Sequence, residues 1–265
     1  MALNKIMVVI DPTQEKQPAF ERALDSAHET GATLHLYIGV DQESGHTGPD
    51  TAREKLQPVL DALAARATTI GVEAATEFEW AAEWRKGVVA AAARCSASMV
   101  FKNTFDHSGV QREVRQTADW TLLRTAPCPV LLVKDFHDWT HRRVLAAINP
   151  AATDAAHIKL NNQIISFARL FTEAYGSDAH FVTAFHDLNH PPEADEIARA
   201  VGTPVDHIHL KHGTAADAIR ATAADLDVDL IIVGTVGRDG IKGRVVGNTS
   251  EKLLDQTHSD LLVIT

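Results

Sequence analysis

Short runs of consecutive apolar residues alternate along the chain with longer stretches in which apolar residues recur at helical spacing. Residues 5–11 form a continuous apolar run of the kind found in a strand that is buried on both faces of a parallel sheet, and Pro12 ends it. From Pro18 to Thr30 the apolar residues follow a helical period, and Gly31 stands where a helix commonly ends. The pattern therefore predicts a strand followed by a helix.

The same pattern continues through the first half of the chain. It predicts strands at 5–11, 32–40, 73–80, 98–102 and 129–133, and helices at 18–30, 51–70, 84–94 and 116–124. Residues 41–50 are predicted to be a loop, and the alternation within 73–80 indicates a half-exposed edge strand. Alternating strands and helices predict a parallel α/β sheet of about five strands with right-handed crossovers. Residues 135–140 are the predicted linker.

After this linker the pattern begins again. The segment from Val144 to Pro150 restates the segment from Ile6 to Pro12, and Leu261–Ile264 restates Val130–Val133. Between them we predict helices at 156–175, 192–201 and 215–224, and strands at 179–185, 204–210 and 229–233. A period of half the chain indicates a duplicated unit. We therefore predict two tandem α/β domains, at 1–136 and 141–265, each with a five-stranded parallel sheet and helices on both faces.

Composition narrows the class of protein. The chain has 265 residues, of which 45% are hydrophobic, and its formal net charge of −10 argues against a sequence-independent nucleic-acid binder. No run approaches eighteen apolar residues, and the first residues lack the features of a signal peptide. Cys95 and Cys128 suit a reducing compartment, with Cys128 packed in the core. We expect a cytoplasmic protein without a membrane span.

A glycine-rich segment follows the predicted strand at 229–233. Gly234 and Gly237 lie close together, and Gly247 precedes small polar residues at the start of a helical pattern. Glycines let backbone N–H groups approach an anion, and a helix N-terminus favours negative charge. In a doubly wound sheet this segment would meet the end of the strand that closes at Asn149, where such folds bind ligands. The segment therefore predicts a nucleotide-phosphate site.

The spacing of Gly234, Gly237 and Gly247, followed by Asn248 and Thr249, resembles the ATP-binding signature of universal stress proteins. The segments 117–123, 127–134 and 260–264 extend the resemblance to the tandem, E-type members of that family. The resemblance implies a flavodoxin-like, adenine-nucleotide-hydrolase-like sheet of order 3-2-1-4-5 in each domain. It also implies domains paired through their fifth strands as an intramolecular pseudo-dimer, and a nucleotide-binding role in stress response or regulation. A further homodimer and a protein partner stay open.

Carried over position by position, the resemblance implies an ATP site in the second domain. Its residues would be Asn149, Pro150, Ala184, Val233, Gly234, Val236, Gly237, Arg238, Gly247, Asn248 and Thr249. The family usually has an aspartate where this domain has Asn149. Because a carboxylate is the hard oxygen ligand that suits Mg²⁺, this exchange weakens the case for metal-assisted binding.

The first domain departs further from the signature. It keeps Asp11, but the three signature glycines are missing from the segment that begins at Lys102 and continues to Arg115. The side chains of Lys102, Phe105 and Arg115 would occupy space that phosphates need. We therefore predict that this domain does not bind ATP in the same way.

Histidines invite a metal hypothesis. His207 and His209 lie two apart on a predicted strand, so both would face one side and could bind Zn²⁺ if other ligands joined them. The competing interpretation is an exposed edge-strand face with polar side chains.

Features of a dedicated enzyme are absent from the sequence. It contains neither a Gly-x-Ser-x-Gly elbow nor a Cys-x-x-Cys pair, and we assign no catalytic residue. Two alternatives to a nucleotide-binding regulatory protein stay open. One is a weak ATPase or phosphotransferase, and the other is a carrier of a small apolar or lipid-like ligand.

Overall fold

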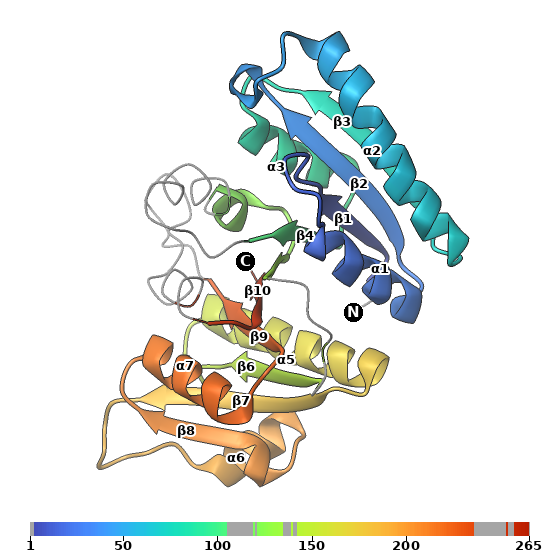
Figure 1. Cartoon of the computed structure of the whole chain (residues 1–265). Helices are drawn as coiled ribbons and strands as arrows, with labels where there is room; N and C mark the ends of the chain where they lie inside the picture. The colour runs from blue at the N-terminus through green and yellow to red at the C-terminus, as the bar shows by residue number, and fades with distance from the viewer. Residues whose placement is uncertain are drawn as a thin grey trace. The chain divides into compact units, whose positions relative to one another are not determined.

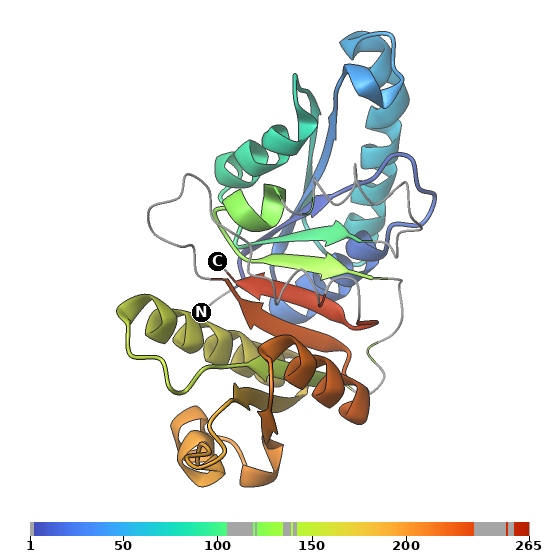
Figure 2. The ribbon, with the colours of Figure 1, turned by 90° about the vertical axis from the view of Figure 1, so that its left-hand side faces the viewer.

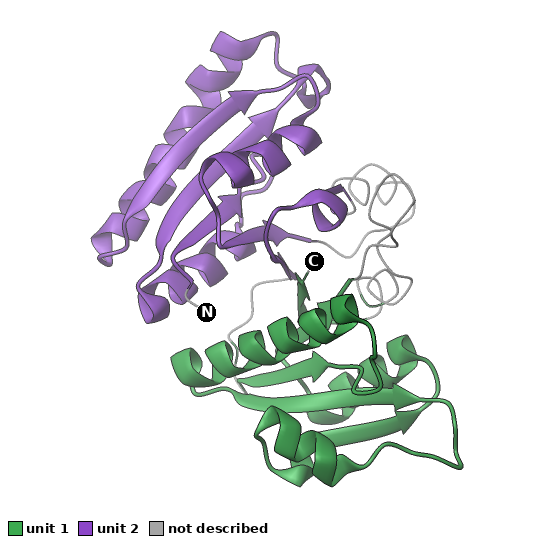
Figure 3. Cartoon of the chain, turned by 180° about the vertical axis from the view of Figure 1, so that it is seen from behind, with its two compact units in different colours: residues 1, 137–265 green, residues 2–136 purple. Residues whose placement is uncertain are grey.

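The computed structural model describes residues 3–104, 119, 121–134, 139, 142–235, 253 and 257–264. The chain divides into two compact units, residues 2–136 and residues 137–265, which are named here the first and the second unit. Figure 3 draws the first unit in purple and the second unit in green. Each unit is described by itself.

The first unit is a parallel sheet with the strand order β3-β2-β1-β4-β5 (Figure 1). This is the predicted order 3-2-1-4-5. The described elements are β1 (Lys5–Val9), α1 (Pro18–Thr30), β2 (Thr33–Val40), α2 (Pro49–Thr69), β3 (Ala74–Trp80), α3 (Trp84–Arg94), β4 (Met99–Asn103) and β5 (Val130–Val133). The predicted edge strand at 73–80 is β3, at the edge of this order.

Helices cover both faces of this sheet. The guanidinium of Arg53, on α2, lies 5.0 Å from the ring centre of Phe78 on β3. Arg94, on α3, instead reaches Glu77 and Glu79, which neighbour Phe78 along the same strand. Because neighbouring residues on a strand point to opposite faces, α2 and α3 cover opposite faces. Figure 2 shows the two helices on either side of the strands.

The second unit repeats this arrangement with the strand order β8-β7-β6-β9-β10, which is again 3-2-1-4-5 when its strands are numbered along the unit. Its described elements are β6 (Arg143–Ala147), α5 (Ala155–Tyr175), β7 (Asp178–Phe185), α6 (Ala194–Val201), β8 (Ile208–His212), α7 (Ala215–Leu226), β9 (Leu230–Gly234) and β10 (Asp260–Ile264). The residues of β9 and β10 are almost wholly buried, as their continuous apolar sequence predicts.

The registers of the two sheets correspond residue by residue. Ile6 pairs with Met99 in the first unit, and Val144 pairs with Leu230 in the second. Counting on from these pairs, Asp11 corresponds to Asn149 and Asn103 corresponds to Gly234. Equivalent positions in the two units can therefore be compared directly.

One strand begins later than the sequence pattern indicated. The prediction of a strand over 204–210 is wrong at its start, because Val205–His207 form a 3-10 turn and β8 covers Ile208–His212. Pro204 is the N-cap of this turn, with the φ of −57° that its ring requires. His207 therefore ends a turn, whereas His209 lies on the strand.

The structure also bears on the predictions for Cys128 and for membrane-spanning helices. Cys128 is buried, and burial raises the pKa of its thiol to about 12, so the prediction of a packed cysteine is confirmed. Within the described part of the chain, no helix is long and apolar enough to cross a membrane. The described residues of the predicted helix at 116–124, which are 119 and 121–124, are helical, whereas the predicted linker at 135–140 is described only at residue 139.

Candidate functional site

The carboxyl edge of the second sheet brings together the described residues of the predicted nucleotide site. Strand β6 runs parallel to both β9 and β7, so the carboxyl ends of all three strands lie at one edge. Asn149 follows β6, Gly234 ends β9, and Ala184 is the second-last residue of β7. Val233 is buried within β9, and Pro150 is exposed beside Asn149.

Asn149 is fixed by hydrogen bonds to its own loop and to α5. Its backbone N–H donates to Oδ1 of Asn161 at 3.1 Å, and its carbonyl accepts from Nδ2 of Asn161 at 2.6 Å. Its side-chain Oδ1 accepts from the N–H of Ala151 at 3.2 Å. The amide oxygen therefore stabilises the turn after β6, a role that an aspartate oxygen can also fill.

Gly234 has a packing reason to be glycine. A Cβ atom at this position would overlap the side chain of Leu160, on α5. The missing side chain lets the end of β9 and the helix approach closely. This glycine thus contributes to helix packing whether or not a phosphate lies nearby, which the motif alone did not reveal.

The remaining predicted contacts fall outside the described residues. They are Val236, Gly237, Arg238, Gly247, Asn248 and Thr249 in the second unit, and Phe105 and Arg115 in the first. Their role stays a prediction from the sequence.

The first unit makes the same turn after β1 with a carboxylate. Oδ1 of Asp11 accepts from the N–H of Thr13 at 2.9 Å and from its hydroxyl at 2.6 Å. The side-chain amide of Gln17 holds the backbone of Asp11 on both sides, accepting from its N–H and donating to its carbonyl. Gln17 therefore makes the same pair of hydrogen bonds that Asn161 makes in the second unit.

The end of β4 differs most from the end of β9. Nζ of Lys102 lies 2.7 Å from Oδ1 of Asp119, and Oδ2 of Asp119 accepts from the hydroxyl of Thr104 at 3.2 Å. Asn103, the counterpart of Gly234, accepts from the N–H of Ala19 at 2.5 Å and so caps the start of α1. Side chains and a buried ion pair thus occupy this end of β4, whereas Gly234 at the end of β9 has no side chain and packs against Leu160.

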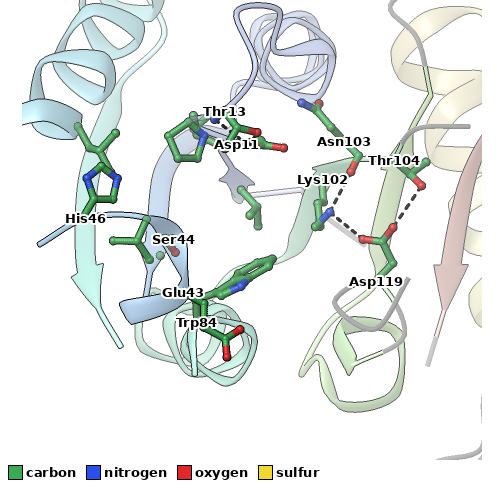
Figure 4. A pocket seen from close by; sticks show the side chains of 16 residues that line it. Asp11, Thr13, Glu43, Ser44, His46, Trp84, Lys102, Asn103, Thr104 and Asp119 are labelled. Carbon is green, nitrogen blue, oxygen red and sulfur yellow. Dashed lines mark hydrogen bonds and ion pairs between the residues drawn. The ribbon is translucent and has the colours of Figure 1, made fainter. Parts of the chain in front are cut away.

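A cavity of about 450 Å³ opens at the carboxyl edge of this first sheet (Figure 4). Val9, Leu56 and Trp84 give it apolar walls. Its described ionisable lining comprises the carboxylates Asp11, Glu43 and Asp119, the ammonium of Lys102, and His46. One ammonium against three carboxylates leaves the described lining net negative, which disfavours a triphosphate.

The candidate metal histidines lie at the opposite, amino-terminal edge of the second sheet. Their rings gather around His180 on β7, whose ring centre is 4.4 Å from that of His207 and 5.2 Å from that of His209. Nε2 of His180 lies 3.1 Å from Oδ2 of Asp178, and Nδ1 of His207 lies 3.4 Å from Oδ1 of the same carboxyl group. The structure thus joins both predicted histidines to two further residues.

Burial affects the pKa of two of these imidazoles. It lowers the pKa of His180, although Asp178 acts in the opposite direction, and it also lowers the pKa of His209. Both rings are therefore neutral at pH 7. The competing interpretation, an exposed edge-strand face, placed His207 and His209 in solvent, but both are half-buried, and His180 beside them is 7% exposed.

Sequence reasoning missed Asp178 and His180, and in the first unit Asp119 and Trp84. The alternation of Asp178 and His180 at a strand start, next to a strand with His209, was a signal that could have found the cluster. Asp119 gave no local signal, because its partner Lys102 is 17 positions earlier in the chain.

Comparison with known proteins agrees with the duplicated fold. The model of the universal stress protein family matches residues 2–134 and again residues 143–265. Universal stress protein E homolog of Haemophilus influenzae is 25% identical over an alignment of 303 positions, which covers 100% of this chain and 98% of that protein. Universal stress protein E of Salmonella typhi is 26% identical over 296 residues, covering 98% and 94%.

Solved structures share the architecture. A Pseudomonas aeruginosa protein is 28% identical and matches with a TM-score of 0.83 over 99% of this chain and 93% of its own. A universal stress protein from Archaeoglobus fulgidus matches with a TM-score of 0.79 over 100% and 99%, at 18% identity. With both halves matched by the family model and both sheets in the same strand order, this chain belongs to the universal stress protein family as a tandem member with two copies of the domain.

Proposed function

We propose that this tandem universal stress protein is a regulatory protein that binds ATP in its second unit. The phosphates would lie against the segment from Gly234 to Thr249, and the adenine against Ala184 on β7. The first unit would not take a nucleotide in this way.

The observation that supports this proposal most is the adjacency of β6 and β9. Because these parallel strands are neighbours, Asn149 and Gly234 reach the same edge of the sheet. The glycine signature continues directly from β9 at that edge. A ligand crevice at the carboxyl ends of adjacent strands, where the strand order reverses, is the common site in this class of sheet.

The identity of Asn149, which follows β6, bears on whether ATP binding depends on Mg²⁺. Asn149 offers an amide oxygen, which already accepts the N–H of Ala151 at 3.2 Å. A neutral, engaged amide is a weaker ligand for Mg²⁺ than the aspartate usual in the family. We therefore expect ATP affinity in this protein to change little when Mg²⁺ is replaced by EDTA.

Titration calorimetry with ATP tests the proposal on the full chain. Gly247→Val should abolish measurable binding, since its side chain would occupy space at the phosphates. The matched control is Gly48→Val in the first unit, where the backbone is extended and no described atom lies within 4 Å of an added Cβ. Equal ATP affinity in both variants and the unaltered protein would contradict the proposal. A phosphate-release assay on the same samples separates binding from slow hydrolysis.

A second role is proposed for the first unit, as a carrier of a small ligand with an apolar body and hydrogen-bond donors. The cavity of about 450 Å³ supports it, because its apolar walls accompany the carboxylates of Asp11 and Glu43. Native mass spectrometry of the full chain should detect a bound mass that Trp84→Ala loses. Trp80→Ala, outside the cavity lining, is the control, and retention of the mass by Trp84→Ala would contradict this role.

A further inference from the structure

Asp178, His180, His207 and His209 lie together at the amino-terminal edge of the second sheet. Asp178, His180 and His207 each offer one ligand atom, and these three atoms lie within 4.8 Å of one another. On β7 and across to β8, Asp178, His180 and His209 share one face, since side chains two apart on a strand point the same way. The group is thus assembled by the sheet register and by the turn that ends at His207.

We propose that Asp178, His180 and His207 form a Zn²⁺ site that is separate from the nucleotide crevice. Two imidazoles and one carboxylate are a ligand set that zinc accepts, with a fourth position left for water.

The distances fit this assignment. Zinc bonds of about 2.0–2.2 Å in a tetrahedral site place neighbouring ligand atoms about 3.3–3.6 Å apart. The carboxyl oxygens of Asp178 already lie 3.1 Å from Nε2 of His180 and 3.4 Å from Nδ1 of His207. These two distances involve different oxygens of the carboxyl group, and one ligand atom from each residue lies within 4.8 Å of the others, so zinc binding requires these atoms to move closer together. Nδ1 of His207 would also have to leave the carbonyl oxygen of Ala179, 3.1 Å away. The side chains of Asp178 and His207 are accessible enough to adjust, at 46% and 24% exposed.

His209 fits the role of a positioning residue. Zinc at Nε2 of His180 leaves Nδ1 as the protonated nitrogen, and Nδ1 lies 3.0 Å from Nε2 of His209. A ligating histidine usually donates its other N–H to such a partner, which fixes the tautomer and the ring orientation. His209 would then hold His180 in place without touching the metal.

Access to the site comes from a cavity of about 300 Å³ that Asp178 and His207 line together with Arg169 and Glu173. The nucleotide crevice lies at the other end of the same strands. Asp178 starts β7 and Ala184 is six residues further on, a strand length of about 20 Å. Failure of the nucleotide proposal would therefore leave this one standing.

The first unit lacks the group at the equivalent positions. Counting along the matched registers, Asp178, His180, His207 and His209 correspond to Thr33, His35, Ala75 and Glu77. Only one histidine remains there, paired with Glu77 at 2.7 Å. We therefore expect one such site in each chain.

A competition titration with a chromogenic zinc chelator, on full-length protein first stripped with EDTA, tests the proposal. His209→Ala should lower zinc affinity about 10–100-fold, as loss of an outer partner does, and Asp178→Asn and His207→Ala at least as much. The matched control is His190→Ala. His190 also pairs with an aspartate three residues away, Asp187, but at an exposed site.

Replacing zinc with Co²⁺ gives a spectroscopic signal that depends on metal coordination. Substitutions of residues that only stabilise the fold would not change this signal. Co²⁺ in the unaltered protein should show the visible absorption of a tetrahedral ion, and Asp178→Asn and His207→Ala should lose it while keeping their circular dichroism. The proposal is overturned if these two variants bind zinc as tightly as His190→Ala, or if zinc binding to the unaltered protein is no tighter than to them.

Discussion

The two units have the same sheet topology but different residues at the carboxyl edge of the sheet. After the first strand, Asp11 and Asn149 accept equivalent backbone N–H groups, so the turn is kept although the charge is lost. After the fourth strand, Asn103 bonds to the start of α1, whereas Gly234 leaves room for Leu160 of α5. The backbone frame therefore tolerates either residue after the first strand, and the two units differ most at the end of the fourth strand.

The outer strands differ in charge as well. In the first unit, Arg94 at the end of α3 pairs with Glu79 at 2.7 Å. At the corresponding positions of the second unit the charges are exchanged, since Asp225 on α7 pairs with Lys211 at 3.2 Å. A helix-to-strand ion pair can thus be kept with either sign, which indicates that the pairing and not the individual residue is what the fold uses.

The largest expected effect comes from the buried ion pair of the first unit. Lys102→Met would leave the carboxylate of Asp119, which is 4% exposed, without its ammonium partner. Breaking a buried pair on one side costs about 3–5 kcal/mol of unfolding free energy, and we expect the lower value because Lys102 is 16% exposed. Urea unfolding followed by circular dichroism measures it.

The second unit supplies the control for this change. Val233 stands where the first unit has Lys102. The double variant Lys102→Val with Asp119→Leu removes both charges and should recover most of the loss, because apolar replacement of a buried pair is often neutral. A loss under about 1 kcal/mol in Lys102→Met would show that this pair contributes little to the first unit.

A smaller effect is expected where the second unit has its glycine. Gly234→Ala should cost about 1–3 kcal/mol, because the added methyl overlaps Leu160. Leu160→Ala alone should cost about 2–5 kcal/mol through the cavity it leaves. Combined, the two changes should cost less than their sum by about 0.5–3 kcal/mol, since one makes room for the other. Strict additivity in urea unfolding would contradict the packing role of Gly234.

The smallest effect concerns the outer strand of the first unit. Burial acts to raise the pKa of Glu77, but hydrogen bonds from Arg94 and His35 outweigh it and lower the pKa. Because the folded pKa is depressed, this contribution to stability is present above the ordinary glutamate pKa of about 4.3 and is lost as pH falls through the folded value. Glu77→Gln should therefore lower stability by about 0.2–1 kcal/mol at pH 7, and by progressively less below pH 4.3.

The comparison unit sharpens this prediction. Asp225→Asn removes the more exposed pair with Lys211, whose side chains are 65% and 38% exposed. It should change stability less than Glu77→Gln at pH 7. A difference between Glu77→Gln and unaltered protein that does not shrink in acid would contradict the assignment of the charge of Glu77 as its cause.

The fold could be predicted well because its signals are local or repeated. The helices Pro18–Thr30 and Trp84–Arg94 have the predicted bounds, since their apolar period and flanking residues define them. The start of β8 could not be predicted in the same way. The apolar pattern does not distinguish the 3-10 turn after Pro204 from the strand that continues it.

Site residues divide along the same line. The positions of Asn149 and Gly234 at the ends of neighbouring strands could be predicted, because each follows or closes a recognisable apolar strand. The ion pair of Lys102 with Asp119, and the group formed by Asp178, His180 and His207, depend on contacts across strands and helices. The spacing of apolar residues in a sequence predicts on which face of a helix or strand a side chain lies, but it does not predict which side chain of another element it contacts.

Counting ATP molecules bound per chain tests the central claim, that one of two matched crevices holds nucleotide, most directly. Equilibrium dialysis of the full chain should give one ATP per chain at saturation. That ATP should be lost in Gly247→Val and kept in Asp11→Asn, which gives the first unit the residue of the second. Two ATP molecules per chain, or a single one lost in Asp11→Asn and kept in Gly247→Val, would contradict the account.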